Sequence, residues 1–257
     1  MTTLGLIGYG AIARDLVSAF SPDTIDWVVL LREGARPELP ANVSAVTRLD
    51  LLIDAKPEAV VEAAGQGAVA AYAPAVLEAG IPTVIASVGA LADMALHTRL
   101  TDAGRIGGAR FILPTGALGG LDYLRAIAAL PDARVRYTSR KPPAAWRAEL
   151  AALGLTAGHD AVVLFEGTPA EAARTYPKNL NAAFAVALAV GADKVTVRVI
   201  ADPMAAGNTH EIEAESAAGT ASFQLANAPS PGNPKTSALT ALSLAAALRD
   251  LLATGGR

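Results

Sequence analysis

The stretch Leu4-Gly5-Leu6-Ile7-Gly8-Tyr9-Gly10-Ala11-Ile12-Ala13 decides the fold. Its first four residues form the short apolar run that is typical of a buried parallel strand. A helix pattern follows, and Gly8, Gly10 and Ala13 between them give the spacing G-x-G-x-x-G/A. Gly8 allows a tight turn, Gly10 lets a pyrophosphate approach the backbone, and Ala13 lets helix and strand pack closely. The pattern predicts a dinucleotide-binding domain.

The start of the helix after this turn supports the same prediction. Ala11 and Ile12 present free backbone N–H groups and the positive end of the helix dipole, which favour a bound phosphate. We therefore expect Gly8, Gly10, Ala11 and Ile12 to contact the dinucleotide. The alternative is a turn in which the glycines have only a structural role.

The end of the second predicted strand, 26–31, bears on the choice between NAD and NADP. A carboxylate at that position binds the ribose hydroxyls, whereas an arginine accommodates a 2′-phosphate. Arg32 occupies the usual place of the acid, and Glu33 follows it. The sequence thus indicates that NADP is accepted. The alternative, in which Arg32 is a solvated surface charge, stays open.

Strands and helices continue to alternate as far as Leu113, with helices expected at 49–55, 65–78 and 91–103. This alternation predicts an α/β fold with a Rossmann-type, doubly wound parallel sheet. Ligands bind beyond the carboxyl ends of the strands in such a sheet. The small residues Ala64, Ser87 and Val88 fall at two of these ends, so we expect them to contact the cofactor, with ordinary strand-to-helix turns as the alternative.

The pattern changes at about Leu113, where we place a domain boundary. Residues 1–113, joined by a C-terminal helix at 235–257, form the predicted dinucleotide-binding domain, and residues 114–234 form an α+β substrate, catalytic and dimerisation domain. The strands expected in the second domain are 135–141, 162–165, 194–201, 209–216 and 221–226, followed by a loop at 227–234. Such strands predict a mixed or antiparallel sheet with one covered face.

His210 is one of three histidines, and it begins a strand in which Ile212 and Ala214 share its covered face. From spacing alone, a packed core histidine is the better interpretation and a catalytic one is the alternative. The other two, His97 and His159, fall in a predicted helix and a predicted turn. Asn181 stands at the front of an apolar helix, where it is either a cap or a ligand contact.

Composition narrows the class of protein. The chain has 257 residues, no cysteine and a net charge of −3 without any block of Lys or Arg. We therefore expect no disulfide, no metal site and no nucleic-acid partner. No apolar stretch is long enough to cross a bilayer, and no export signal opens the chain, so we expect a cytoplasmic protein without a membrane partner.

Several blocks together resemble the L-aspartate dehydrogenase family. They are Gly8-Tyr9-Gly10-Ala11-Ile12, Ser87-Val88-Gly89-Ala90-Leu91, Gly116-Ala117-Leu118-Gly119-Gly120-Leu121-Asp122, Pro177-Lys178-Asn179-Leu180-Asn181, Ala201-Asp202-Pro203, Asn208-Thr209-His210-Glu211-Ile212 and Asn233-Pro234-Lys235-Thr236. The resemblance implies interconversion of L-aspartate with iminoaspartate, and so with oxaloacetate and ammonia, using NAD or NADP. It also implies an acid/base role for His210, cofactor contacts at Ala117 and Asn181, and a homodimer. Arg32 departs from the acid that many members carry.

The two carboxylates of aspartate need cations or N–H groups. Asn208, Lys178, Lys235 and a helix start at 117–120 are the candidates for binding the substrate. Two other functions remain open, namely a related imine or aldehyde reductase and a dinucleotide-binding sensor without catalysis.

Overall fold

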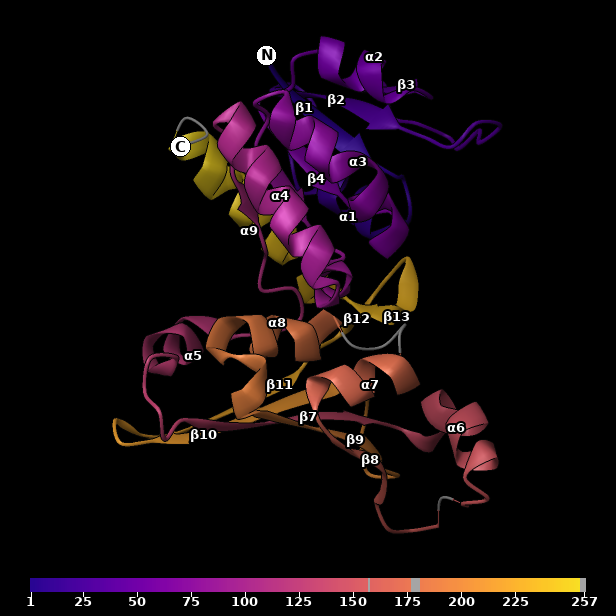
Figure 1. Ribbon diagram of the computed structural model, residues 1–257. Helices are drawn as coiled ribbons and strands as arrows, with labels where there is room; N and C mark the ends of the chain where they lie inside the picture. The colour runs from indigo at the N-terminus through magenta and orange to yellow at the C-terminus, as the bar shows by residue number, and fades with distance from the viewer. Residues whose placement is uncertain (157, 177–180, 255–257) are drawn as a thin grey trace. The chain divides into compact units, whose positions relative to one another are not determined.

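The computed structural model describes residues 1–156, 158–176 and 181–254 of the chain. These residues form two compact units (Figure 1). One unit comprises Met1–Gly116 and Thr240–Arg257, and the other comprises Ala117–Leu239.

The first unit contains a six-stranded sheet with the order β3-β2-β1-β4-β5-β6, and all its strand pairs are parallel. The strands are β1 (Thr2–Ile7), β2 (Ile25–Leu30), β3 (Val43–Val46), β4 (Val60–Glu62), β5 (Thr83–Ile85) and β6 (Phe111–Ile112). The predicted doubly wound sheet is therefore confirmed. The strand β3 is not among the predicted strands, because Ser44 and Ala45 are exposed at this short sheet edge and the sequence there carries no run of buried residues.

The helices of this unit are α1 (Ala11–Ser18), α2 (Leu49–Asp54), α3 (Gln66–Glu78) and α4 (Met94–Gly107), with a short 3-10 helix, η1 (Val88–Ala92), before α4. The prediction that the helix α4 begins at residue 91 was wrong. Asp93 is the N-cap of α4, and its carboxylate accepts hydrogen bonds from the N–H groups of Ala95 and Leu96 at 2.9 and 3.3 Å. This cap fixes the helix start after the apolar residues of η1.

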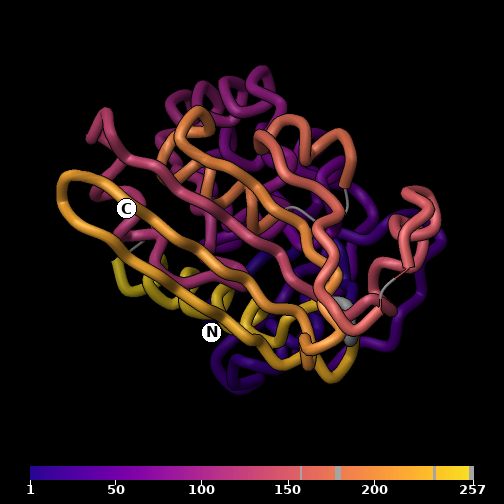
Figure 2. The backbone as a smooth tube through the Cα atoms, turned by 90° about the horizontal axis from the view of Figure 1, so that it is seen from below, coloured from indigo at the N-terminus to yellow at the C-terminus, as the bar shows by residue number. Residues whose placement is uncertain are grey.

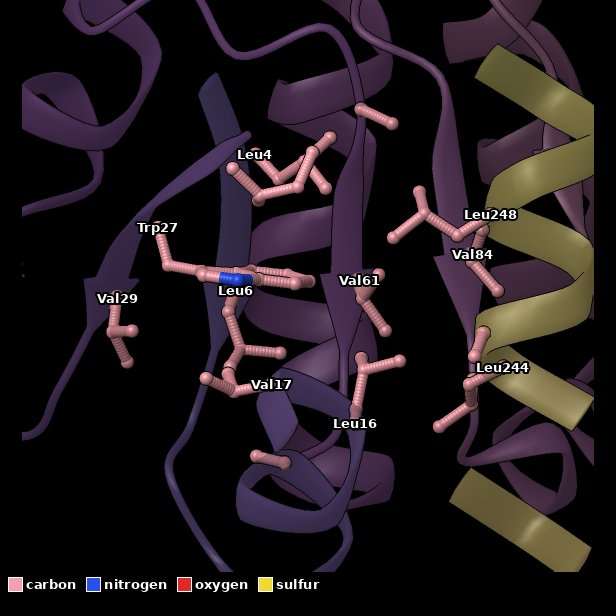
Figure 3. Close-up of a cluster of buried hydrophobic side chains, with 14 of the residues drawn as sticks. Leu4, Leu6, Leu16, Val17, Trp27, Val29, Val61, Val84, Leu244 and Leu248 are labelled. Carbon is pink, nitrogen blue, oxygen red and sulfur yellow. The ribbon is translucent and has the colours of Figure 1, made fainter. Parts of the chain in front are cut away.

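The C-terminal helix α9 (Ala238–Ala253) completes the core of the first unit (Figure 3). Its Leu244 and Leu248 are fully buried in the cluster that also holds Leu4 and Trp27. Full burial of a leucine contributes about 1.5–3 kcal/mol, so these side chains hold the helix on the sheet. The predicted C-terminal helix is thus present; the segment expected for it opens at residue 235, whereas the helix itself begins at Ala238.

The residues before α9 form strands. β12 (Pro229–Ser230) pairs antiparallel with β13 (Asn233–Ser237), so the prediction of a loop at 227–234 was wrong. The abundance of Pro, Gly, Asn and Ser in this stretch is typical of turns, and the pairing of two such short strands leaves no periodic signal.

The second unit contains a five-stranded sheet, which is mixed, as predicted, and has the strand order β11-β10-β7-β9-β8. Its strands are β7 (Arg134–Lys141), β8 (Val162–Gly167), β9 (Val195–Ala201), β10 (Thr209–Ser216) and β11 (Gly219–Ala226), and only the β7–β9 pair is parallel. The β10–β11 hairpin forms one edge of this sheet (Figure 2).

The helices of the second unit are α5 (Leu121–Ile127), α6 (Arg147–Ala152), α7 (Pro169–Thr175) and α8 (Asn181–Val190), with 3-10 turns η2 (Pro143–Trp146) and η3 (Ala192–Lys194). In Figure 1, α5, α7 and α8 lie along one face of the sheet. His210, Ile212 and Ala214 of β10 are all buried, so the prediction that they share a covered face is confirmed; Thr209, at the start of the strand, is buried as well.

Within the described ranges, no helix is both long and apolar enough to cross a membrane.

Candidate functional site

The turn after β1 requires glycine at its first position. Gly8 has φ +86°, and a Cβ built on it would lie 2.6 Å from the Cβ of Ala64. Any side chain would therefore be strained in backbone conformation and would also collide with the loop after β4. The close approach of Gly8 to Ala64 brings the carboxyl ends of β1 and β4 together, where a doubly wound sheet binds its ligand.

A cavity of about 820 Å³ opens at this turn. Gly8, Gly10, Arg32 and Ala64 line it, so the structure brings these four predicted cofactor contacts together. A Cβ on Gly10 would meet no atom within 4 Å, and no side chain caps α1. The first N–H groups of α1, at Ala11 and Ile12, consequently remain available to a phosphate, and the turn fits a dinucleotide.

The cavity wall beyond β2 is positively charged. Arg32 and Arg36 both line it, and neither Asp nor Glu occurs among its described lining residues. Gly34 adopts φ +81°, and the N–H of Ala35 donates to the carbonyl of Arg32 at 3.1 Å, so a tight turn connects the two arginines. Glu33 does not line the cavity. An anionic ligand is therefore favoured there over the bare hydroxyls of a ribose.

The remaining predicted contacts of the first unit lie at the end of β5. Ser87 is the N-cap of η1 and Val88 is its first residue, and both are buried. Neither is among the described residues that line the 820 Å³ cavity. Ser87 is nevertheless tied to the Ala64 loop, since both bond the carboxylate of Glu62.

His210 lies at the start of β10 and is 5% exposed. Its Nδ1 is 2.7 Å from the hydroxyl oxygen of Tyr137 on β7, and its Nε2 is 3.3 Å from Nδ2 of Asn208. The rings of His210 and Tyr137 are stacked, with centroids 6.0 Å apart. Both ring nitrogens of the histidine therefore have a polar neighbour inside the protein.

The placement of the Asn208 amide, with Nδ2 toward the ring, corresponds to one tautomer of His210. The amide nitrogen of Asn208 can only donate a hydrogen bond, so Nε2 of His210 must accept it. The ring proton is then on Nδ1, which donates to the Tyr137 oxygen. His210 consequently presents an unprotonated Nε2, the form that a general base requires.

The surroundings keep the imidazole neutral. Burial lowers the pKa of His210 to about 4, and the positive charge of Lys141 acts in the same direction. Burial also raises the pKa of the Tyr137 hydroxyl, so the tyrosine stays protonated. Burial lowers the pKa of Lys141, whose Nζ lies 4.7 Å from the centre of the Trp146 ring.

Tyr137 and Lys141 are not among the site residues predicted from the sequence. Both belong to β7, where residues 135, 137, 139 and 141 alternate onto one face of the strand. Ser139 is the register partner of His210, so Tyr137 lies one pleat away on the same face. A buried tyrosine needs a partner for its hydroxyl, and this was the signal available in the sequence.

The other predicted residues of the second unit have different positions. The carbonyl of Ala117 accepts a hydrogen bond from Asn227 Nδ2 at 2.8 Å. The helix start expected at 117–120 was wrong, because α5 begins at Leu121 after Gly120, which has φ +75°. Asn181 is the first residue of α8 and is exposed.

Two candidate lysines cannot be placed. Lys178 lies outside the described residues, and so does the side chain of Lys235, whose backbone belongs to β13.

Comparison with known proteins agrees with this arrangement. Residues 122–251 match the family model described as aspartate dehydrogenase, C-terminal, and residues 8–114 match the NAD binding domain of homoserine dehydrogenase. L-aspartate dehydrogenase 2 of Bordetella bronchiseptica is 45% identical over 97% of each chain. L-aspartate dehydrogenase of Ruegeria pomeroyi is 43% identical over 96% of this chain and 91% of its own.

A solved structure gives the same result. The crystal structure of aspartate dehydrogenase from Thermotoga maritima has a TM-score of 0.80 and 31% identity, covering 98% of this chain and 97% of its own. The match therefore extends through the fingerprint turn, the mixed sheet and the strand that carries His210. The chain belongs to the aspartate dehydrogenase family.

Proposed function

We propose that the protein is an L-aspartate dehydrogenase that uses NAD or NADP and interconverts L-aspartate with iminoaspartate, and so with oxaloacetate and ammonia. The observation that carries the proposal is the buried pair of His210 and Tyr137, in which Nδ1 is bonded to the tyrosine and Nε2, next to the amide of Asn208, takes the proton. This pair belongs to a chain that also has the dinucleotide turn and the family relationship described above.

When bound, the nicotinamide supplies or accepts the hydride at the substrate carbon. His210 acts as the acid/base residue. Its Nε2 accepts a proton from the amine, or from the water that attacks the imine, and returns it in the reverse direction. Tyr137 stays bonded to Nδ1 throughout, which keeps the ring in one orientation. Asn208 holds Nε2 until a substrate group or water replaces its amide.

The charge of the substrate tunes this base. A pKa of about 4 is too low for an effective base near neutral pH. Two carboxylates arriving beside His210 favour the imidazolium and raise the pKa toward neutrality. The positive charge of Lys141, already felt at His210, makes it our principal candidate for binding a carboxylate. Lys178, Lys235 and Asn208 remain proposed substrate contacts, and Ala117 and Asn181 remain proposed cofactor contacts.

We also propose that NADP is preferred to NAD. The support is the cavity that Arg32 and Arg36 line without a carboxylate among its described residues. A guanidinium forms two parallel hydrogen bonds to a phosphate, which NAD lacks at the 2′ position. The ratio of kcat/KM for NADPH to that for NADH measures the preference, and a ratio below one contradicts it.

Ammonia dependence tests the reaction. Purified protein is mixed with oxaloacetate and NADPH or NADH, with and without ammonium chloride, and the reduced cofactor is followed by absorbance. Oxidation that needs ammonium and yields L-aspartate is expected. Oxidation without ammonium indicates the competing carbonyl reductase, and binding without any turnover indicates the sensor.

The family relationship finally leads us to propose a homodimer. Size-exclusion chromatography with light scattering should give twice the mass of one chain, whereas the mass of a single chain refutes the dimer.

A further inference from the structure

Glu62 is a buried carboxylate that the reaction proposed above does not use. It ends β4 and is 0% exposed. Its Oε1 accepts hydrogen bonds from the N–H groups of Ala64 and Gly65 at 2.8 and 2.7 Å, and from the Ser87 hydroxyl at 3.1 Å. Its Oε2 accepts one from the N–H of Ser87 at 3.0 Å. Four donors therefore converge on one side chain.

This arrangement fits an ionised carboxylate. Three of the four donors are backbone N–H groups, which can only donate a hydrogen bond. Burial raises the pKa of Glu62, while the four hydrogen bonds favour the charged form. No ion pair of Glu62 occurs among the described residues, so hydrogen bonds alone compensate the charge.

The two loops that Glu62 connects follow neighbouring strands. Ala64 and Gly65 follow β4, and Ser87 follows β5, which pairs with β4 in parallel. The strands are three residues long here, so their own ladder gives the loops little support. The backbone ladder ends with the N–H of Ala63 on the carbonyl of Ile7 and the N–H of Ala86 on the carbonyl of Glu62. The Glu62 carboxylate bonds the N–H groups that follow, those of Ala64, Gly65 and Ser87.

The sheet order shows which part of a dinucleotide these loops contact. The fingerprint turn follows β1 and the arginines follow β2, so the pyrophosphate and the adenosine half belong to that side. In the order β3-β2-β1-β4-β5-β6, the opposite side of the turn is formed by β4 and β5. The nicotinamide half must therefore extend over the loops that Glu62 connects.

We propose that Glu62 is a positioning residue, which fixes the Ala64–Gly65 and Ser87 loops relative to each other and so orients the nicotinamide half of the bound dinucleotide. Misplacement of a reacting group by about 1 Å can cost on the order of a hundredfold in rate. The chemistry of this inference rests on the proposed function, whereas the binding part is independent of the substrate.

The test compares Glu62→Gln with wild type. Glutamine has nearly the same volume, but one of its two terminal atoms is an NH2 group that donates. In either orientation it faces an N–H group and loses at least one bond. If the loss of this bond disorders the loops, we expect it to weaken NADPH binding roughly tenfold.

The readout is selective for one half of the ligand. Binding of NADPH and of 2′,5′-ADP, which carries only the adenosine half, is measured by calorimetry. We expect the Kd of NADPH to rise about tenfold and that of 2′,5′-ADP to change by less than about twofold. kcat should fall more than KM for oxaloacetate rises, since orientation and not substrate binding is impaired.

Two further variants serve as controls. Glu58→Gln alters an exposed carboxylate just before β4 and should leave both ligands unaffected. Ser87→Ala removes the hydroxyl bond but keeps the backbone bond, so NADPH binding should weaken by less than in Glu62→Gln, about threefold. If Glu62→Gln does not fold, Ser87→Ala with 2′,5′-ADP still decides the question.

Unchanged NADPH binding and kcat in folded Glu62→Gln would overturn the proposal. Equal weakening of NADPH and 2′,5′-ADP would also overturn it, because a general structural role does not distinguish the two halves. A wild-type protein without ammonia-dependent turnover would refute the proposed function instead. The Kd values of NADPH and 2′,5′-ADP would still test the positioning role of Glu62.

Discussion

Lowering the pH from 7 to 5 should destabilise the second unit through His210. An unfolded histidine titrates at its ordinary pKa of 6.5, whereas burial and Lys141 lower the folded pKa to about 4. The unfolded chain therefore binds the proton more tightly, and the stabilisation present above pH 6.5 is lost as the pH falls toward 4. The full difference is roughly 3 kcal/mol. About 2 kcal/mol of it should be lost between pH 7 and pH 5.

The assay must separate His210 from the carboxylates that also titrate. Urea unfolding is followed by the fluorescence of Trp146, which is 1% exposed in the second unit, in a Trp27→Phe background that silences the first unit. The same measurement on His210→Gln removes the imidazole and keeps every carboxylate. Wild type should lose about 2 kcal/mol more than His210→Gln over this pH range. An equal loss in the two proteins would refute the assigned environment of His210.

Four other substitutions have defined outcomes. Gly8→Ala should abolish NADPH binding, because its Cβ would meet Ala64 at 2.6 Å and its φ is unfavourable; calorimetric binding comparable to wild type would contradict this. Tyr137→Phe should lower kcat about tenfold or more without changing the Kd of NADPH, since it leaves Nδ1–H of the histidine unpaired; an unchanged kcat would exclude the positioning role. Arg32→Ala should lower the ratio of kcat/KM for NADPH to that for NADH by about tenfold, and a constant ratio would show that the arginine is only a surface charge. Leu248→Ala should cost about 2–5 kcal/mol of unfolding free energy by denaturation, and a loss below about 1 kcal/mol would mean that α9 contributes little to the core.

The first unit could be predicted well because its signals are local. The glycine spacing and the alternation of apolar strands with helices are each read within a short stretch, and together they specify the parallel sheet. Errors arose where a single side chain or a weak pairing decided the outcome. Asp93 caps α4, so that helix begins later than predicted. The strands β12 and β13 pair in a stretch whose composition is typical of turns.

The site was less accessible from the sequence. The position of His210 could be read from an alternating strand, but its importance came from the family resemblance. Its contact with Tyr137 depends on the register of β10 against β7, which joins residues far apart in the chain and is set by the folded sheet. Glu62 was hidden for a similar reason. It ends a short buried strand, and its partners lie on two different loops.

The role of His210 in an ammonia-dependent reaction is tested most directly by the initial rate of NADPH oxidation with oxaloacetate, measured with and without ammonium, in wild type and in His210→Gln. We expect an ammonium-dependent rate that forms L-aspartate and that falls by roughly a hundredfold or more in His210→Gln, while that variant still binds NADPH. A rate that does not require ammonium, or that survives loss of the imidazole unchanged, would contradict this role.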